Sequence, residues 1–344
     1  MSFMKTAFLI WTLLTGLMGF SFSQETPLAE KTWPQMVTLI DAPHVEVIEE
    51  APAKKTFMYR SPHYVFICDS RLRGDVVKEF GRLFEATYLI NCKLPLDLRP
   101  VPESSRTHFH ALLFTNYEDY MRAGGLPGSA GVYINSKNAL MVPLISLGVK
   151  LSGSGQTVLL DKNSDDDNAT LIHEITHQMM NQWLGSMRIW QIEGSAEYIR
   201  MLDYNRFGRF SLTNLNKQLK LYVQKMNPQG GGKTFVMANL EELMTMENEQ
   251  WSAVLAGARG AAAVNYGSAA LLIYYFYHLD GAGNSANMIA FLRGLENAKS
   301  YEEEDALVKK HLLRNRTYVQ LADDVKSAFR KEGIDITFPQ MAKN

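Results

Sequence analysis

The chain has 344 residues, of which 46% are hydrophobic, so it can bury a sizeable core as one large domain or two sub-domains. Its 35 basic and 36 acidic residues leave a formal net charge of -1. Such a balance provides no basic field for phosphate backbones, and we therefore expect no nucleic-acid partner.

The N-terminus has the features of an export signal. Lys5 supplies a positive charge, residues 7–20 are uncharged and mostly apolar, and small residues precede Gln24. An uncleaved anchor helix is the alternative, but the apolar run is short for a membrane span. We predict a signal peptide at residues 1–23 that is cleaved, which leaves no stable membrane span. The expected location is exported, either periplasmic or extracellular.

The next part of the chain predicts an extended segment followed by a mixed sheet. Residues 24–57 contain four prolines and are expected to be an extended lead-in. Residues 58–165 are expected to form a mixed α/β sheet sub-domain, because runs rich in β-branched and aromatic residues alternate with helical periodicity. The expected elements are strands at 45–48, 64–68, 108–114 and 158–160, a helix at 75–91, a short helix capped by Asn116, and a hairpin of residues 131–135 and 139–143.

From residue 168 onward the apolar residues recur mainly at helical spacing. Residues 166–338 are therefore predicted to be a helical sub-domain, and a mixed sheet followed by helices defines an α+β fold. The last helix has a capping-box start, Thr317 with Gln320, and a stop at Gly333. The expected helices are 169–184, 192–203, 213–226, 239–248, 267–279, 285–296, 303–313 and 318–331.

Cys68 and Cys92 are the only cysteines, and two cysteines in an exported chain suggest a disulfide. Cys68 ends a predicted strand, whereas Cys92 follows a predicted helix of about sixteen residues that is roughly 24 Å long. Because the helix should run back along the strand, the two residues should lie near its opposite ends. A disulfide needs Cα atoms within about 7 Å, so we expect two free buried thiols.

Residues His173-Glu174-Ile175-Thr176-His177 have the pattern H-E-x-x-H. On a helix His173 and His177 lie one turn apart on one face, so both imidazoles can reach a single metal ion. Glu174 lies about 100° round the helix, beside the metal, where it can take a proton from an attacking water. The pattern is typical of zinc proteases, with the glutamate as general base.

The flanks of this pattern favour a buried helix. Residues 161–168 are a polar run in which Asp167 or Asn168 is available as N-cap, and Gly185 is expected just beyond the C-terminus. The apolar residues of the segment are Leu171, Ile172, Ile175, Met179, Met180 and Leu184.

A carboxylate-bearing segment follows, with the sequence Trp190-Gln-Ile-Glu193-Gly-Ser-Ala-Glu197-Tyr198. Glu193 and Glu197 are one helical turn apart and share a face. Residues 178–192 separate His177 from Glu193, which is enough for a short connection and the start of a second helix.

These two segments together resemble the gluzincins, the thermolysin-like clan of zinc metallopeptidases, and most closely their secreted bacterial peptidase-MA-like branch. The motif covers residues 168–200, and a looser likeness runs from about 58 to 335. The gap before Glu193 is shorter than in the aminopeptidase branch of the clan. The resemblance implies a thermolysin-like fold in which the sheet and the helices form one catalytic unit.

The resemblance also implies the roles of the site residues. One Zn²⁺ ion would be held by His173, His177 and Glu193, with Glu174 as general base. Glu197 falls where clan members often keep an acidic residue that orients a ligand histidine. The implied activity is hydrolysis of a peptide or protein substrate.

Two further features are implied by the resemblance. Clan members usually stabilise the oxyanion with a donor from a downstream helix, and Tyr266, which opens a predicted helix, matches that position; Tyr198 is a second candidate. An edge strand before the H-E-x-x-H helix would hold an extended peptide, and residues 139–142 are the candidate.

Other interpretations stay open at this stage. His108 and His110 share a strand face but have no visible third ligand, which favours a structural or partly exposed role. The whole chain could be a catalytically silent gluzincin-fold protein that serves binding or regulation. It could also be a secreted α+β binding protein with a chance motif, and this reading predicts that Glu193 lies far from the histidines.

Overall fold

The computed structural model describes residues 32–339 except 97, 104, 128, 130, 152–156, 160–164, 182, 258 and 259. These residues belong to one compact unit that begins at Thr32. The predicted signal peptide and residues 24–31 of the predicted lead-in lie outside the described residues. In the described part of the chain, no helix is long and apolar enough to cross a membrane.

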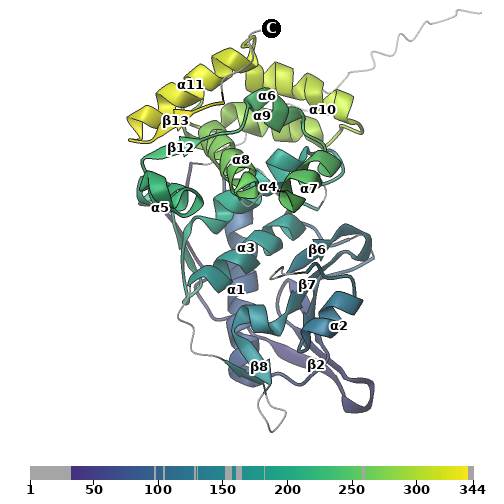
Figure 1. The fold of residues 1–344 in the computed structure, drawn as a ribbon. Helices are drawn as coiled ribbons and strands as arrows, with labels where there is room; N and C mark the ends of the chain where they lie inside the picture. The colour runs from purple at the N-terminus through teal and green to yellow at the C-terminus, as the bar shows by residue number, and fades with distance from the viewer. Residues whose placement is uncertain are drawn as a thin grey trace, which may run out of the picture. The chain divides into compact units, whose positions relative to one another are not determined.

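The predicted α+β class is confirmed. The described residues form eleven α-helices, one mixed six-stranded sheet and three smaller sheets. Figure 1 shows the six-stranded sheet at one end of this unit and helices α6 to α11 at the other, together with strands β12 and β13; helix α3 lies between the two ends.

The six-stranded sheet has the strand order β2-β3-β4-β5-β7-β6. Strands β4, β5 and β7 are parallel to one another, and the remaining pairs are antiparallel. Helix α1 (Gly74–Lys93) connects β4 to β5 and buries one face on the sheet, where the Phe84 ring contacts Tyr64 and Phe66 at 4.9 and 5.0 Å between centroids. The strands are β2 (Glu46–Ala51), β3 (Thr56–Arg60), β4 (Tyr64–Cys68), β5 (Phe109–Phe114), β6 (Val132–Ile134) and β7 (Ala139–Pro143).

The prediction that residues 139–142 form an edge strand is wrong. Strand β7 pairs with β5 on one side and with β6 on the other, so β6 is the edge. All five residues of β7 are buried, whereas the three residues of β6 are partly exposed. A continuous apolar run such as β7 is typical of a strand covered on both faces, which requires an interior place in the sheet.

The helical half is built round α8 (Ala261–His278), which is buried along most of its length and has no polar face. Helix α4 packs closely against it at Gly194, where an added Cβ would lie 2.5 Å from the carbonyl oxygen of Ala269. Glycine is thus required for this close approach. The remaining helices are α2 (Tyr117–Arg122), α3 (Asp165–Met179), α4 (Ile189–Arg200), α5 (Leu215–Met226), α6 (Leu240–Thr245), α7 (Asn248–Ala256), α9 (Ala286–Leu295), α10 (Tyr301–Leu307), which continues as a π-helix (Val308–Leu313), and α11 (Tyr318–Lys331).

From residue 32 onward the predicted lead-in is part of the folded unit. The Trp33 indole donates a hydrogen bond to the Ser285 hydroxyl at 2.9 Å and packs 4.2 Å from the His278 ring. Three small sheets complete the fold: β1 (Met36–Thr38), β11 (Arg209–Ser211) and β10 (Asp203–Asn205) form one, β8 (Val149–Leu151) and β9 (Thr157–Leu159) the second, and β12 (Thr234–Val236) and β13 (Asp335–Thr337) the third.

Several predicted elements are confirmed, among them β4, the hairpin of β6 and β7, the Asn116 cap of α2 and the capping box of α11. As predicted, the cysteines form no disulfide; Cys68 is buried and Cys92 is partly buried. Helix α7 and the strands β1, β3, β8 and β10 to β13 were not predicted.

The boundaries of the two site helices differ from the prediction. Helix α3 begins at Asp165, so residues 167 and 168 lie inside its first turns and do not cap it. The helix ends at Met179, so Gly185 does not cap it. The prediction was too long because Met180 and Trp183 are buried in the turn that follows the helix, and they extend the apolar periodicity beyond it. Helix α4 starts three residues earlier than predicted.

Candidate metal centre

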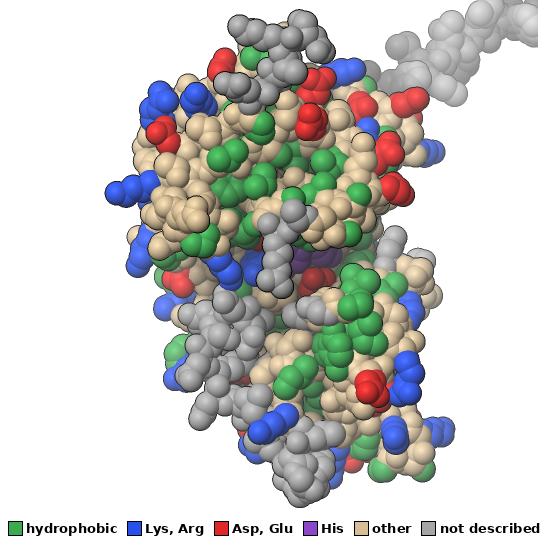
Figure 2. Space-filling model, in the orientation of Figure 1, with side chains coloured by type: hydrophobic (Ala, Val, Ile, Leu, Met, Phe, Trp, Pro, Cys, Tyr) green, Lys and Arg blue, Asp and Glu red, His purple; other side chains and the backbone are tan. Residues whose placement is uncertain are grey.

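Helices α3 and α4 bring together the three predicted ligand residues. The Nε2 atoms of His173 and His177 lie 3.0 Å apart, and Glu193 Oε2 lies 3.2 Å from the first and 3.5 Å from the second. Among the described residues this is the one group of three or more histidines, cysteines and acids that could hold a metal ion. His108 and His110 are not part of such a group. Figure 2 shows histidine side chains at the floor of a hollow, with hydrophobic side chains on both of its sides.

The separations fit a small divalent cation. Tetrahedral zinc with bonds of 2.0–2.1 Å places its ligand atoms about 3.3 Å apart, which the three observed separations bracket. Glu193 Oε2 is buried, and the two imidazole nitrogens are its close polar neighbours within the described part of the chain. A cation would satisfy all three atoms at once, whereas a single proton can bridge only one pair of them.

Glu197 supports the first of these ligands. Its Oε1 faces Nδ1 of His173 at 2.9 Å, from one helical turn beyond Glu193. A carboxylate in this position keeps the proton on Nδ1 and so directs the lone pair of Nε2 towards the centre. Glu197 is 1% exposed, so it cannot exchange this contact for water.

Two residues that the sequence analysis missed hold Glu197 in turn. The Tyr222 hydroxyl donates to Glu197 Oε2 at 2.7 Å, and Arg200 Nη1 donates to Oε1 at 2.8 Å. Arg200 follows Glu197 by three residues on α4, so helical spacing could have indicated it. Tyr222 comes from α5, and no local pattern in the sequence links it to α4.

The carboxylates give the centre a strongly negative potential. Burial lowers the pKa of His173, but hydrogen bonding and charge from Glu193 and Glu197 outweigh burial and raise it to about 10. Burial raises the pKa of Glu193, but the two imidazoles outweigh this and hold it well below the usual range. Without a metal His173 therefore retains its proton, and the same carboxylates also favour a divalent cation.

Glu174 lies between the centre and the edge strand β6. Burial raises its pKa, while the imidazoles of His173 and His177 oppose this and the backbone N–H of Tyr133 lowers it further as a hydrogen-bond donor. Gly131 packs beside this side chain: an added Cβ would touch Glu174 Cγ at an ordinary 3.5 Å and would be tight only against the Met141 carbonyl oxygen, at 3.2 Å.

The two tyrosine candidates have different surroundings. Tyr266 lies in the second turn of α8 and does not open it; its ring centroid is 6.3 Å from His173 and 5.2 Å from Trp251. The Tyr198 hydroxyl shares a hydrogen bond of 2.8 Å with His278 Nε2, and burial lowers the pKa of that histidine to about 3, which keeps it neutral. Tyr198 is therefore already paired, and Tyr266 is the tyrosine beside the centre.

Comparison of the chain with protein-family models finds no match, and comparison with curated proteins finds none either. The interpretation of the site therefore depends on its own geometry and chemistry.

Proposed function

We propose that the chain is an exported, zinc-dependent peptidase of the gluzincin type with a thermolysin-like fold. The observation that carries this proposal is the meeting of two imidazole Nε2 atoms and one carboxylate oxygen at 3.0–3.5 Å, beside the partly buried Glu174 of α3. Export is proposed from the N-terminal sequence alone.

Each residue of the centre has a separate role in the proposed hydrolysis of a peptide bond. Zn²⁺ held by His173, His177 and Glu193 would polarise the attacking water and the scissile carbonyl. Glu174 accepts the proton of that water and passes it to the leaving amine, a task that suits a glutamate whose pKa is raised by burial. Tyr266 donates a hydrogen bond to the carbonyl oxygen as negative charge develops there.

The surroundings of the centre support an extended peptide as substrate. Strand β6 is the edge of the sheet, and a backbone N–H of this strand already contacts Glu174. A peptide added to the outer side of β6 would run past the centre with its main chain hydrogen-bonded. The hollow in Figure 2 has hydrophobic side chains on both sides, which could receive apolar side chains of the substrate.

One of the two alternative functions conflicts with the geometry of the centre, and the other does not. A chance motif in a binding protein predicts that Glu193 lies far from the histidines, and the separation of 3.2 Å from His173 contradicts this. A catalytically silent protein of the same fold remains the second candidate, because the same ligands could hold zinc for a structural or regulatory purpose.

Elemental analysis of the purified mature protein and of the Glu174→Gln variant tests the proposal. We expect one zinc per chain in both, and a loss of peptide-library hydrolysis of about 10²- to 10⁴-fold in the variant. Glu303→Gln on α10 is a matched control that should hydrolyse normally. A wild-type protein without zinc would contradict the metal site, and one that binds zinc but hydrolyses nothing would favour the silent protein. An active Glu174→Gln variant would refute the role of the general base.

A further inference from the structure

A second buried glutamate, Glu304 of α10, meets the first turn of α4. Its side chain is 0% exposed, and its Oε1 accepts hydrogen bonds from the Gln191 amide at 2.7 Å and from the Arg188 backbone N–H at 3.3 Å. The Arg188 guanidinium lies 3.2 Å from the other carboxylate oxygen. All of these contacts are with the N-terminus of the helix that carries Glu193.

Arg188 extends this contact to two other helices. Its guanidinium donates to the Thr245 carbonyl at the end of α6 at 3.0 Å and to Asp305 at 3.1 Å, and it lies 4.3 Å from the centre of the Tyr301 ring. The Arg188 side chain is 7% exposed and Glu304 is 0% exposed, so their contact is shielded from water, whereas Asp305 is 39% exposed. The start of α4 is thus fixed to α6 and α10 through one arginine and one glutamate.

Helix α4 depends on Glu304 because it has no side-chain cap of its own. Its N-cap residue is Arg188, whose side chain makes no capping hydrogen bond. A carboxylate at the N-terminus of a helix accepts from its free N–H groups and is favoured by the helix dipole. Glu304 supplies that carboxylate from a segment more than one hundred residues further along the chain.

The placement of Glu193 depends on this helix as a whole. Beyond the two imidazoles, no group in the described part of the chain holds the Oε2 atom of Glu193. Its position is therefore set by where α4 lies: the contact of Gly194 with α8 fixes the middle of the helix, and Glu197 fixes the last turn. The first turn, which precedes Glu193, is fixed by Glu304.

We propose that Glu304 is a positioning residue for the metal centre, which caps α4 from α10 and holds Glu193 at the distance that a shared cation requires. This inference rests on the proposed function, because it assumes that the centre binds zinc. Glu304 touches neither zinc nor substrate, and it acts through the helix.

The test measures zinc affinity by competition with a chelator, which does not depend on enzyme activity. It is done at pH 8, because burial raises the pKa of Glu304 to about 7 and the carboxylate is then ionised. Glu304→Gln keeps the shape but loses the charge, and we expect it to weaken zinc binding about tenfold, as do other changes to groups that support metal ligands. The absorption spectrum of the cobalt-substituted protein should change as well, because the ligand geometry changes.

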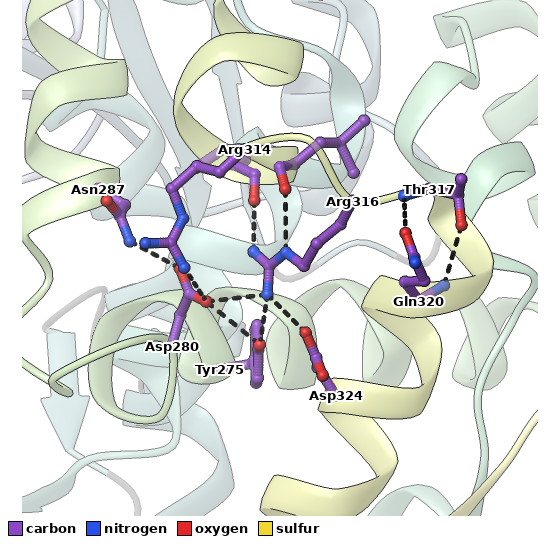
Figure 3. Close-up of polar contacts among 10 residues, drawn as sticks. Tyr275, Asp280, Asn287, Arg314, Arg316, Thr317, Gln320 and Asp324 are labelled. Carbon is purple, nitrogen blue, oxygen red and sulfur yellow. Dashed lines mark hydrogen bonds and ion pairs between the residues drawn. The ribbon is translucent and has the colours of Figure 1, made fainter.

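Asp280→Asn is the matched control, since Asp280 is also a buried carboxylate of the helical half paired with arginine. Figure 3 shows it bonded to Tyr275, Asn287, Arg314 and Arg316, none of which belongs to α4. We expect its zinc affinity to stay within about twofold of wild type, because distant sites act independently.

The outcomes separate the two proposals. A wild-type protein that binds no zinc refutes the proposed function. If wild type binds zinc and Glu304→Gln binds it equally well, or if Asp280→Asn loses as much affinity, the positioning role is wrong. Should Glu304→Gln fail to fold, Gln191→Met removes one of the same hydrogen bonds at little change in volume, and an unchanged affinity and cobalt spectrum in that variant would also overturn the proposal.

Discussion

Two buried polar clusters, one round Asp280 and one round Glu193, differ in how their donors and acceptors are paired. In the cluster round Asp280, Oδ1 accepts from Tyr275, Arg314 and Arg316 at 3.1–3.3 Å, and Oδ2 accepts from Asn287 at 2.9 Å. Figure 3 shows these donors converging on one carboxylate from α8, α9 and the segment before α11. Every contact pairs a donor with an acceptor, which is the arrangement that a purely structural cluster needs.

The candidate metal centre differs, because three atoms that can each bind a cation face one another. Glu193 Oε2 and the Nε2 atoms of His173 and His177 lie within 3.5 Å of one another, and the proton of charged His173 is the donor among them. The proton of His173 can join only one pair of these atoms, whereas a metal cation would join all three. The Asp280 cluster is therefore complete as it stands, whereas the three atoms of the candidate centre have room for a shared cation.

The largest expected effects are on stability in the Asp280 cluster and on zinc affinity in the candidate metal centre. Asp280→Asn should destabilise the metal-free protein by about 3 kcal/mol, because it leaves buried arginines without their partner, and should leave zinc affinity unchanged. Glu193→Ala should lower zinc affinity by about three orders of magnitude, because each ligand carries a large share of the binding free energy, and should cost less stability. Urea unfolding of the metal-free proteins and chelator competition measure the two quantities. If both variants lost both properties equally, the distinction between the clusters would fail.

Tyr222→Phe is expected to lower zinc affinity less than the loss of a ligand does. The hydroxyl donates to Glu197 Oε2 at 2.7 Å, and without it Glu197 orients His173 less firmly. We expect zinc affinity to fall by about tenfold, in the range found for partners of ligand residues. Tyr204→Phe is the control, since its ring packs on Phe210. Equal affinity of Tyr222→Phe and wild type would show that Glu197 needs no support.

Sequence reasoning found the parts of this centre that obey helical spacing. His173 and His177, and then Glu193 and Glu197, are each four residues apart, and that spacing alone places each pair on one face of its helix. That the two faces meet was implied by the resemblance, and spacing could not supply it.

Residues that depend on long-range packing could not be predicted. Tyr222 and Glu304 reach α4 from α5 and α10, and neither has a local signal that names its partner. The edge of the sheet was missed for the same reason, because the hairpin sequence does not tell which of its strands pairs with β5. Local patterns define elements, whereas the order of strands and the contacts between helices come from the packed core.

Zinc affinity should depend on pH, because the carboxylates of the candidate centre hold a proton on His173. The pKa of His173 is raised to about 10, and zinc needs this imidazole neutral. Below pH 10 the proton must therefore leave as zinc binds, so zinc affinity should keep rising with pH from about 7 to 9, with release of about one proton per zinc at pH 8. An ordinary histidine, with a pKa near 6.5, would already be neutral at pH 8 and would release almost none. Calorimetry in two buffers of different ionisation enthalpy measures the release. Glu197→Gln should reduce it, because one of the carboxylates that raise the pKa is gone, and a zinc affinity that is flat above pH 7 in wild type would contradict the electrostatic account of the centre.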